Sequence, residues 1–268
     1  MNLTAEIFAI GSELCFGRIY DTNSFWVANQ LTKLGVHVQR ITCLTDNVRS
    51  ITSALNDSVS RKPTFIFLSG GLGPTDDDLT IEALSRVTSF PTRVDSDGLR
   101  WMAEKENVPL ERLDKRLNKM AVSLVGAEVL RNPVGWAPAT HLKFKETEVY
   151  ALPGPPTELR EFFNQYIIGT IANRTGRKSY SARFVATMYE EELSPLIRQV
   201  TGKDQDVYIK ALVSEYKPNI GLPLEILAFG NSDDECQQKM EKTMQELTEL
   251  VSSQGKILKQ VNPSYDDR

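Results

Sequence analysis

Histidine is nearly absent from this sequence. The only two histidines, His37 and His141, stand far apart, each within a strand-like run. Two such histidines therefore give little basis for a catalytic triad or for a metal site with imidazole ligands. We expect both histidines to be structural.

Cysteine is almost as scarce. Cys15, Cys43 and Cys236 are widely spaced, odd in number, and include no C-x-x-C pair. Such thiols are typical of a reducing compartment. We therefore expect reduced cysteines and a cytoplasmic protein.

Long apolar runs and basic blocks are missing as well. No window approaches the roughly 18 apolar residues of a membrane-spanning helix, and residues 1–6 lack the basic start and apolar stretch of a signal peptide. The net charge is -4 and the isoelectric point about 5.4. Without a basic block the chain lacks the electrostatic footprint of a nucleic-acid binder. We expect neither membranes nor nucleic acids as partners.

The composition is that of an ordinary globular enzyme. With 41% hydrophobic and 25% charged residues, the 268-residue chain can form one large domain or two unequal ones. Its first two thirds alternate strand and helix patterns, which predicts an α/β domain with a parallel sheet covered on both faces. The predicted strands are 5–10, 36–42, 64–68, 128–130, 141–144 and 148–152. The predicted helices are 22–34, 47–59, one after Pro74, 96–106, 110–122 and 156–172.

The most informative segment runs from Phe65 to Glu82. A strand buried on both faces, 64–68, leads into a glycine-rich turn with Gly70, Gly71 and Gly73, where a ligand can approach the backbone closely. Thr75 and Asp78 have capping-box spacing, which predicts that residues 76–78, three aspartates, form the first turn of a helix.

Two functions fit this aspartate run. Acidic residues in a first turn stabilise a helix through its dipole by roughly 0.3 to 1 kcal/mol each. However, three aspartates exceed what capping needs, and they would repel a phosphate at the turn unless a divalent cation stood between them. We favour a metal or phosphate site over a merely well-capped helix.

Polar loops follow several of the predicted strands. Because ligands bind beyond the carboxyl ends of parallel strands, we expect these loops to meet on one rim of the sheet. They are Gly11-Ser12-Glu13, Asp46, the glycine and aspartate segment 70–78, and Pro153–Pro156.

Four motifs carry a resemblance to a known family. They are G-S-E-L-C-F-G-R-I-Y-D-T-N (11–23), G-G-L-G-P-T-D-D-D-L-T-I-E-A (70–83), N-P-V-G-W-A-P (132–138) and L-P-G-P-P-T-E-L (152–159). In this order and spacing they resemble the N-terminal region of CinA-like proteins, within the MoaB/Mog molybdopterin-binding superfamily. The resemblance is strong over residues 1–172 and weak beyond.

The resemblance implies a three-layer α/β/α domain with a mostly parallel sheet. For the CinA-like branch it implies a divalent-metal-dependent pyrophosphatase that splits ADP-ribose into AMP and a sugar phosphate, with FAD as a second candidate substrate. Bacterial relatives often add a nicotinamide-nucleotide amidase domain. We expect this chain to lack that domain and its activity.

The resemblance also assigns roles to residues. Asp77 and Asp78 are expected to bind the metal, and Glu13 or Asp46 to add a ligand or to orient the attacking water. Carboxylate oxygens suit magnesium, manganese or cobalt, and potassium is a further candidate ion. The expected substrate-binding residues are Gly70, Gly71, Gly73, Thr75, Asn23, Asn132, Pro153 and Gly154.

Simpler roles compete with some of these. Asp21, Thr22 and Asn23 can cap one helix, Asp46 can cap the next, and Gly154 can serve a turn. The chain also departs from the family pattern at three positions, with Ser12 in place of Asp or Asn, Ala139 in place of glycine, and Pro155 in place of an apolar residue. Ser12 matters most, because it removes a carboxylate or amide from the rim.

A second domain follows a polar linker, 173–179. Strand patterns at 182–188, 207–216, 222–229 and 256–260 and helix patterns at 191–200 and 233–253 give the order β-α-β-β-α-β over residues 180–261. This order predicts a smaller α+β ferredoxin-like domain. It has no catalytic cluster, so we expect it to shape one wall of the site or to form a homo-oligomer. The tail, 262–268, is expected to be flexible.

Three functions remain open at this point. The first is the nucleotide pyrophosphatase. The second is a molybdopterin-binding protein or an adenylyl transferase of molybdenum cofactor biosynthesis, and the third is a catalytically silent binding module. Fold alone cannot separate them, because function lies in the site.

Overall fold

Two units make up the computed structural model, which describes residues 3–114 and 116–261. The first unit extends to Arg174 and excludes residues 33–35. The second contains those three residues and the chain from Thr175 onward. Among the described residues, no helix is both long and apolar enough to cross a membrane.

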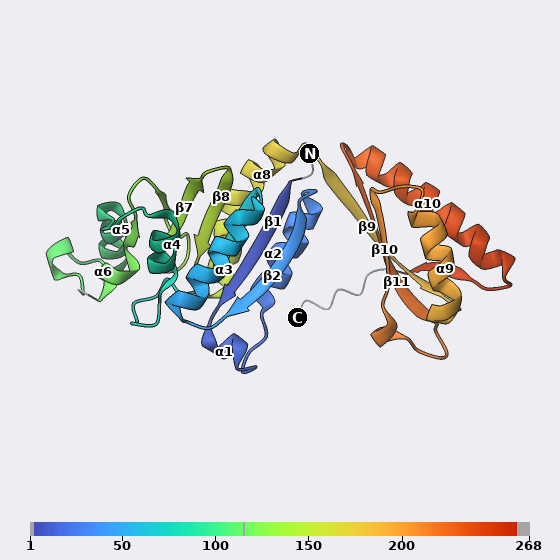
Figure 1. Ribbon diagram of the computed structural model, residues 1–268, viewed down its shortest axis with the longest axis horizontal. Coiled ribbons are helices and arrows are strands. Elements are labelled where there is room, and N and C mark those ends of the chain that lie inside the picture. The colour runs from blue at the N-terminus through green and yellow to red at the C-terminus, as the bar shows by residue number, and fades with distance from the viewer. Residues whose placement is uncertain (1–2, 115, 262–268) are drawn as a thin grey trace. The chain divides into compact units, whose positions relative to one another are not determined.

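The first unit is built on a six-stranded sheet with the order β2-β1-β3-β8-β7-β6 (Figure 1). Its four parallel strands are β2 (His37–Leu44), β1 (Thr4–Ile10), β3 (Phe65–Ser69) and β8 (Thr147–Leu152). Strands β7 (Ala139–Phe144) and β6 (Glu128–Leu130) extend the sheet in antiparallel fashion. The predicted mostly parallel sheet is confirmed.

Helices cover both faces of this sheet. On one face, α3 (Val48–Arg61) and α4 (Thr80–Thr88) pack on alternate residues of β1 and β3, including Phe8 and Leu68. On the other face lie α2 (Thr22–Lys33) and a helical run of α7 (Pro156–Phe162), a π-helical segment (Phe163–Ile167) and α8 (Ile168–Thr175).

Aromatic side chains fill this second face. Phe163 lies 5.4 Å from Trp26 and 5.8 Å from Phe67 between ring centroids. All five residues of β3 are buried, as its uninterrupted apolar pattern predicts. Burying each large side chain contributes roughly 1.5 to 3 kcal/mol. The three-layer α/β/α domain is confirmed.

The helix predicted at 110–122 is wrong. After α5 (Ser96–Glu106) the chain forms a 3-10 turn (Leu110–Arg112), a short helix α6 (Leu117–Met120) and strand β5 (Val122–Leu124). Strand β5 pairs with β4 (Thr92–Val94), and Leu124 is fully buried. Tertiary pairing and burial therefore override the local helical pattern.

The predicted start of α4 is also wrong. Residues 76–78 do not form its first turn, because the helix begins at Thr80. The buried Thr80 donates its hydroxyl to the Gly70 carbonyl at 2.7 Å and its N–H to the Gly71 carbonyl at 3.2 Å. These bonds anchor the chain to the glycine turn, so the aspartates lie in a loop before the helix.

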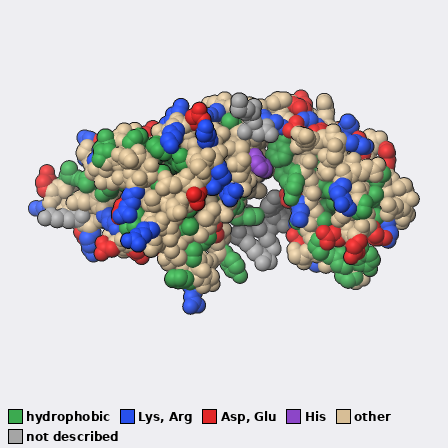
Figure 2. All heavy atoms as spheres, viewed as in Figure 1, with side chains coloured by type: hydrophobic (Ala, Val, Ile, Leu, Met, Phe, Trp, Pro, Cys, Tyr) green, Lys and Arg blue, Asp and Glu red, His purple; other side chains and the backbone are tan. Residues whose placement is uncertain are grey.

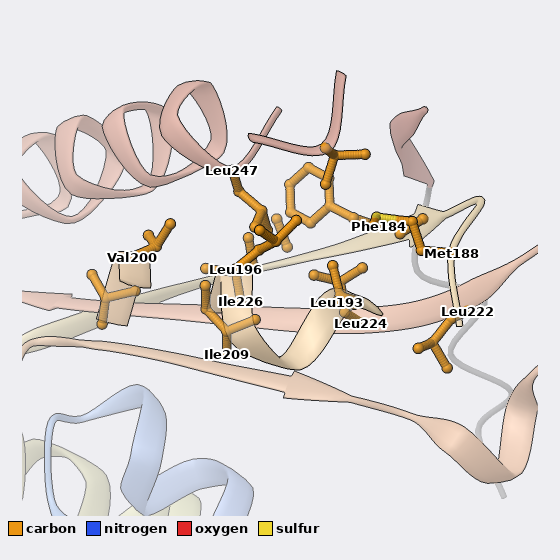
Figure 3. Close-up of a cluster of buried hydrophobic side chains, with 14 of the residues drawn as sticks. Phe184, Met188, Leu193, Leu196, Val200, Ile209, Leu222, Leu224, Ile226 and Leu247 are labelled. Atoms are coloured by element: carbon orange, nitrogen blue, oxygen red, sulfur yellow. The ribbon is translucent and has the colours of Figure 1, made fainter. Parts of the chain in front are cut away.

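The second unit has the predicted ferredoxin-like order. Its elements are β9 (Lys178–Ala186), α9 (Glu190–Thr201), β10 (Val207–Ala211), β11 (Leu222–Gly230), α10 (Asp233–Ser253) and β12 (Leu258–Val261). The strands form an antiparallel sheet, β10-β11-β9-β12, and their inner side chains pack on the two helices (Figure 3). Strand β10 is shorter than predicted, since a 3-10 turn follows at Val213–Glu215.

Regular structure occupies most of the segment where we predict a linker. Helix α8 continues to Thr175 and β9 begins at Lys178, so only two residues of 173–179 lie between these elements. The predicted flexible tail, 262–268, lies outside the described residues.

Candidate functional site

The four parallel strands end side by side. In the sheet register Leu44 pairs with Ile10, and Ser69 pairs with both Ala9 and Leu152. The loops after these strands therefore emerge on one rim, as expected for the binding edge of a parallel sheet.

These loops enclose a cavity of about 380 Å³. All the predicted site residues except Asn23 and Asn132 line it. The roles assigned to them remain predictions. The lining residues used below are Glu13, Asp46, Gly70, Gly71, Gly73, Thr75, Asp77, Asp78, Trp136, Pro153, Gly154 and Glu158.

The floor of the cavity is the glycine turn after β3. Gly70 has φ +101°, and a Cβ there would lie 2.2 Å from the Ile10 carbonyl oxygen. A Cβ on Gly73 would lie 2.6 Å from Asp78 Oδ2. Only glycine fits both the backbone conformation and the close approach at Gly70.

Thr75 gathers two carboxylates at one side of the cavity. Its hydroxyl lies 2.5 Å from Asp77 Oδ1 and 2.6 Å from Asp78 Oδ2, and its N–H donates to Asp78 Oδ2 at 2.8 Å. The Thr75 hydrogen bond lowers the pKa of Asp77, with smaller contributions from the backbone and from the charge of Lys119. Asp77 is therefore an anion at neutral pH.

Ser12 and Asp46 connect the loops after β1 and β2. The Ser12 N–H donates to Asp46 Oδ2 at 2.7 Å, and the Asp46 N–H donates to Ser12 Oγ at 3.1 Å. Asp46 does not cap α3, because Asn47 does: its Oδ1 accepts from the Arg49 and Ser50 N–H groups at 3.1 Å. The Asp46 side chain is thus held at the cavity.

Asn23 does not line the cavity, but its hydrogen bonds support two of the segments that form the rim. Its Nδ2 donates to Ser69 Oγ at 2.8 Å and to the Gly154 carbonyl at 2.7 Å. It therefore fastens the end of β3 to the loop after β8. Asp21 accepts from the Ser24 N–H at 2.9 Å and serves the start of α2.

Asn132 positions a carboxylate that the sequence prediction missed. Its Nδ2 donates to Glu158 Oε2 at 2.6 Å and to the Ala137 carbonyl at 2.8 Å. Glu158 lines the cavity from α7. It belongs to the L-P-G-P-P-T-E-L motif, but in sequence it looks like an ordinary first-turn acid.

A second cavity, of about 570 Å³, adjoins the first at Trp136, which lines both. Its other walls include Trp101, Asn132 and Tyr166. Lys105 lies 5.1 Å from the centroid of the Trp136 ring and donates to the Val134 and Gly135 carbonyls at 2.5 Å. Half-buried aromatic side chains of this kind suit the planar base of a ligand.

The carboxylates fit a hard divalent cation only in part. Asp77 and Asp78 present neighbouring oxygens, which magnesium and manganese accept. Within residues 3–114 and 116–261, no group of three or more His, Cys, Asp or Glu side chains is arranged to hold an ion. The pair would thus supply part of a coordination shell, and ligand phosphates and water would supply the rest, as is common for magnesium.

Comparison with known proteins identifies the first unit. The family model described as "Probable molybdopterin binding domain" matches residues 6–173. The chain belongs to this molybdopterin-binding domain family. Within the family it is CinA-like: it is similar to the solved structure of the protein CinA from Thermoplasma acidophilum, with a TM-score of 0.59 and 29% identity. That match covers 63% of this chain and 98% of the other, whose function is described as unknown.

Two relatives match nearly the whole chain of this CinA-like protein. A protein of Metallosphaera sedula is 31% identical over 266 residues, which is 98% of this chain and 100% of the relative. A protein of Pyrobaculum arsenaticum is 32% identical over 254 residues, covering 93% and 95%. The likeness therefore extends over both units.

The family's molybdopterin-binding domain makes this a small-molecule-binding protein. The structure shows the surroundings of the three positions where the resemblance implies a different residue. Ser12 keeps a side-chain hydrogen bond to the rim. Ala139 is fully buried at the start of β7, and Pro155 precedes α7, whose first residue is Pro156.

Proposed function

We propose that this protein binds a diphosphate-linked nucleotide at the rim cavity and hydrolyses its diphosphate with a divalent metal ion. One observation carries the proposal: five carboxylates, those of Glu13, Asp46, Asp77, Asp78 and Glu158, line a cavity with a glycine turn. Glycine turns suit phosphates, whereas carboxylates repel them. A cation between the two reconciles these features.

Asp77 and Asp78 would hold the ion. Thr75 keeps their oxygens together, and the lowered pKa of Asp77 keeps that carboxylate charged. When bound, the ion would neutralise the diphosphate and lower the pKa of a coordinated water. Gly71 and Gly73 would let the phosphates approach the backbone.

Asp46 would orient the attacking water. One of its oxygens, Oδ2, accepts from Ser12, which leaves Oδ1 for the water. Glu13, which is exposed on the same rim, would contribute a further carboxylate oxygen to the polar groups around the ion. The water adds to one phosphorus, the bridging oxygen leaves with the other phosphate, and ADP-ribose yields AMP and ribose phosphate.

Trp136 would separate the two ends of the substrate. The diphosphate would lie over the glycine turn, and the base would reach past Trp136 into the aromatic cavity. This division suits a ligand with a planar base joined to a diphosphate, such as ADP-ribose or FAD.

The family match favours a second function. Members of a molybdopterin-binding family would place the phosphate of a pterin over the glycine turn and the pterin ring against Trp136. In that case the protein is a carrier or an adenylyl-transferring enzyme of molybdenum cofactor biosynthesis, and it binds molybdopterin without splitting ADP-ribose.

One experiment decides between them. AMP release from ADP-ribose and FAD is measured with magnesium, manganese or cobalt, with and without potassium. The tested variant carries Asp77→Asn and Asp78→Asn, and the matched control is Asp76→Asn, since Asp76 is exposed in the same loop but does not line this cavity. Hydrolysis is supported if wild type and the Asp76→Asn control release AMP in a metal-dependent reaction and the double variant does not. Molybdopterin binding without AMP release supports the second function.

A further inference from the structure

Two of the three cysteines lie together beside the cavity. Cys15 is the last residue of α1 (Ser12–Cys15), and Cys43 is on β2, the edge strand. Their sulfur atoms are 3.4 Å apart, although the residues are 28 positions apart in sequence. A disulfide needs about 2 Å, so a small local movement would join them.

Both thiols are accessible to small molecules. Cys15 and Cys43 are exposed, whereas Cys236 is buried in the second unit, with its thiol 3.4 Å from the Lys178 carbonyl. The chain around α1 projects into solvent: Phe16 is 68% exposed and Tyr20 is 92% exposed. Hydrophobic side chains project from the lower edge of the first unit in Figure 2, where Figure 1 places α1.

We infer that Cys15 and Cys43 form a reversible oxidation site whose co-reactant is a low-molecular-weight disulfide. The Cys15 thiolate attacks one sulfur of the small disulfide, forming a mixed disulfide and releasing one small thiolate. The Cys43 sulfur then loses its proton to solvent and attacks the Cys15 sulfur, which releases the second small thiolate. One protein dithiol and one small disulfide thus become one protein disulfide and two small thiols.

The surroundings set the order of attack. Although the Cys43 side chain is exposed, partial desolvation raises its pKa to about 12, together with the hydrogen bond and charge of Cys15 and the charges of Asp21 and Glu13. Cys43 therefore does not supply the first thiolate at neutral pH. Cys43 can resolve the intermediate because its sulfur lies 3.4 Å from the Cys15 sulfur.

The bond would close the same two segments that Ser12 and Asp46 already join. Cys15 follows Glu13 by two residues, and Cys43 precedes Asp46 by three. A disulfide would fix α1, which carries Glu13, against β2 and restrict its motion. The thiol chemistry does not depend on the proposed hydrolysis, so each can fail without the other.

The full chain tests the oxidation directly. After equilibration with excess oxidised glutathione and trapping with a maleimide, wild type is expected to lose two thiols together and to yield a linked Cys15–Cys43 peptide. Cys43→Ser is expected to stop at a glutathione adduct on Cys15. Cys15→Ser is expected to keep Cys43 reduced, and Cys236→Ser to behave like wild type.

Other outcomes would overturn the inference. These are three free thiols in oxidised wild type, a bond that includes Cys236, or a bond only between two chains on a non-reducing gel. The effect on α1 is measured by amide hydrogen exchange. Exchange at residues 12–16 is expected to slow several-fold in the oxidised chain, and unchanged exchange would refute the restriction of α1.

Discussion

Ser12 and Asp46 bind each other through two reciprocal hydrogen bonds, at 2.7 Å and 3.1 Å, from loops that follow different strands. The pairing gives Ser12 a structural role at a position where the resemblance implies Asp or Asn. The hydroxyl supplies no charge to the cavity, but it holds the Asp46 backbone, and the Ser12 backbone in turn holds the Asp46 carboxylate.

Removal of this hydroxyl should loosen Asp46. We expect Ser12→Ala to lower the free energy of unfolding by about 1 kcal/mol, as is usual for one lost hydrogen bond. Under the proposed function, it should also slow AMP release. Urea denaturation and the hydrolysis assay measure the two effects. Ser12→Thr keeps the hydroxyl and is the control, and equal losses in both variants would contradict this role.

Gly70 should tolerate no side chain. We expect Gly70→Ala to lower the free energy of unfolding by more than about 2 kcal/mol, because φ of +101° disfavours alanine and the new Cβ meets the Ile10 carbonyl. Gly126 also has a positive φ, +84°, but its Cβ would meet nothing within 4 Å. Gly126→Ala should therefore cost only about 1 kcal/mol. Equal costs in urea denaturation would show that the close approach at Gly70 is unimportant.

Acid should destabilise the fold through Glu6. This carboxylate is fully buried on β1 and accepts two hydrogen bonds from Arg61, each at 2.7 Å. Burial alone raises the pKa of Glu6, but the hydrogen bonds and charge of Arg61, helped by Ser58 and Arg40, outweigh it, so the pKa lies below its ordinary value.

The sign of the pH dependence follows from this lowered pKa. The stabilisation is present above the unfolded-state pKa of about 4.3 and is lost as pH falls through the lower folded-state value. Glu6→Gln should remove that part of the acid dependence of the free energy of unfolding. Arg61→Ala leaves a buried unpaired carboxylate and should cost about 3 kcal/mol at neutral pH. A Glu6→Gln variant with the wild-type acid dependence would refute the assignment.

Trp136 should contribute to binding of the base. Under the proposed function, we expect Trp136→Ala to raise KM for ADP-ribose about tenfold, since an aromatic contact with a base is worth roughly 1 to 3 kcal/mol. The affinity of the Trp136→Ala variant for inorganic pyrophosphate, measured with manganese by calorimetry, should hardly change. A parallel loss of affinity for pyrophosphate would instead place Trp136 at the diphosphate end.

The local sequence pattern was sufficient to predict the parallel sheet and the rim at which its strands end. The uninterrupted apolar run before Gly70 could only be a buried strand, and the ends of parallel strands meet by geometry, which is why Glu13, Asp46 and the aspartate loop could be grouped in advance. The start of α4 could not be predicted, because it depends on bonds from Thr80 to the glycine turn.

Contacts between segments that are distant in the chain could not be predicted from the sequence. Asn132 and Glu158 are 26 residues apart, and nothing local signals their hydrogen bond. The pairing of Cys15 with Cys43 was likewise hidden, since their spacing matches no thiol motif. The strand at Val122–Leu124 forms only because β4 is there to pair with it.

The rim cavity is lined by the end of β1 and by the loop after β8, segments that lie more than a hundred residues apart in sequence. A molecule bound there spans the beginning and the end of the first unit, so it can bind only when the whole parallel sheet is assembled. Its binding energy therefore adds to the stability of the entire unit, by RT ln(1 + [L]/Kd). A rise in the melting temperature therefore reports binding, so compounds and metal ions can be screened in this way before any reaction is known.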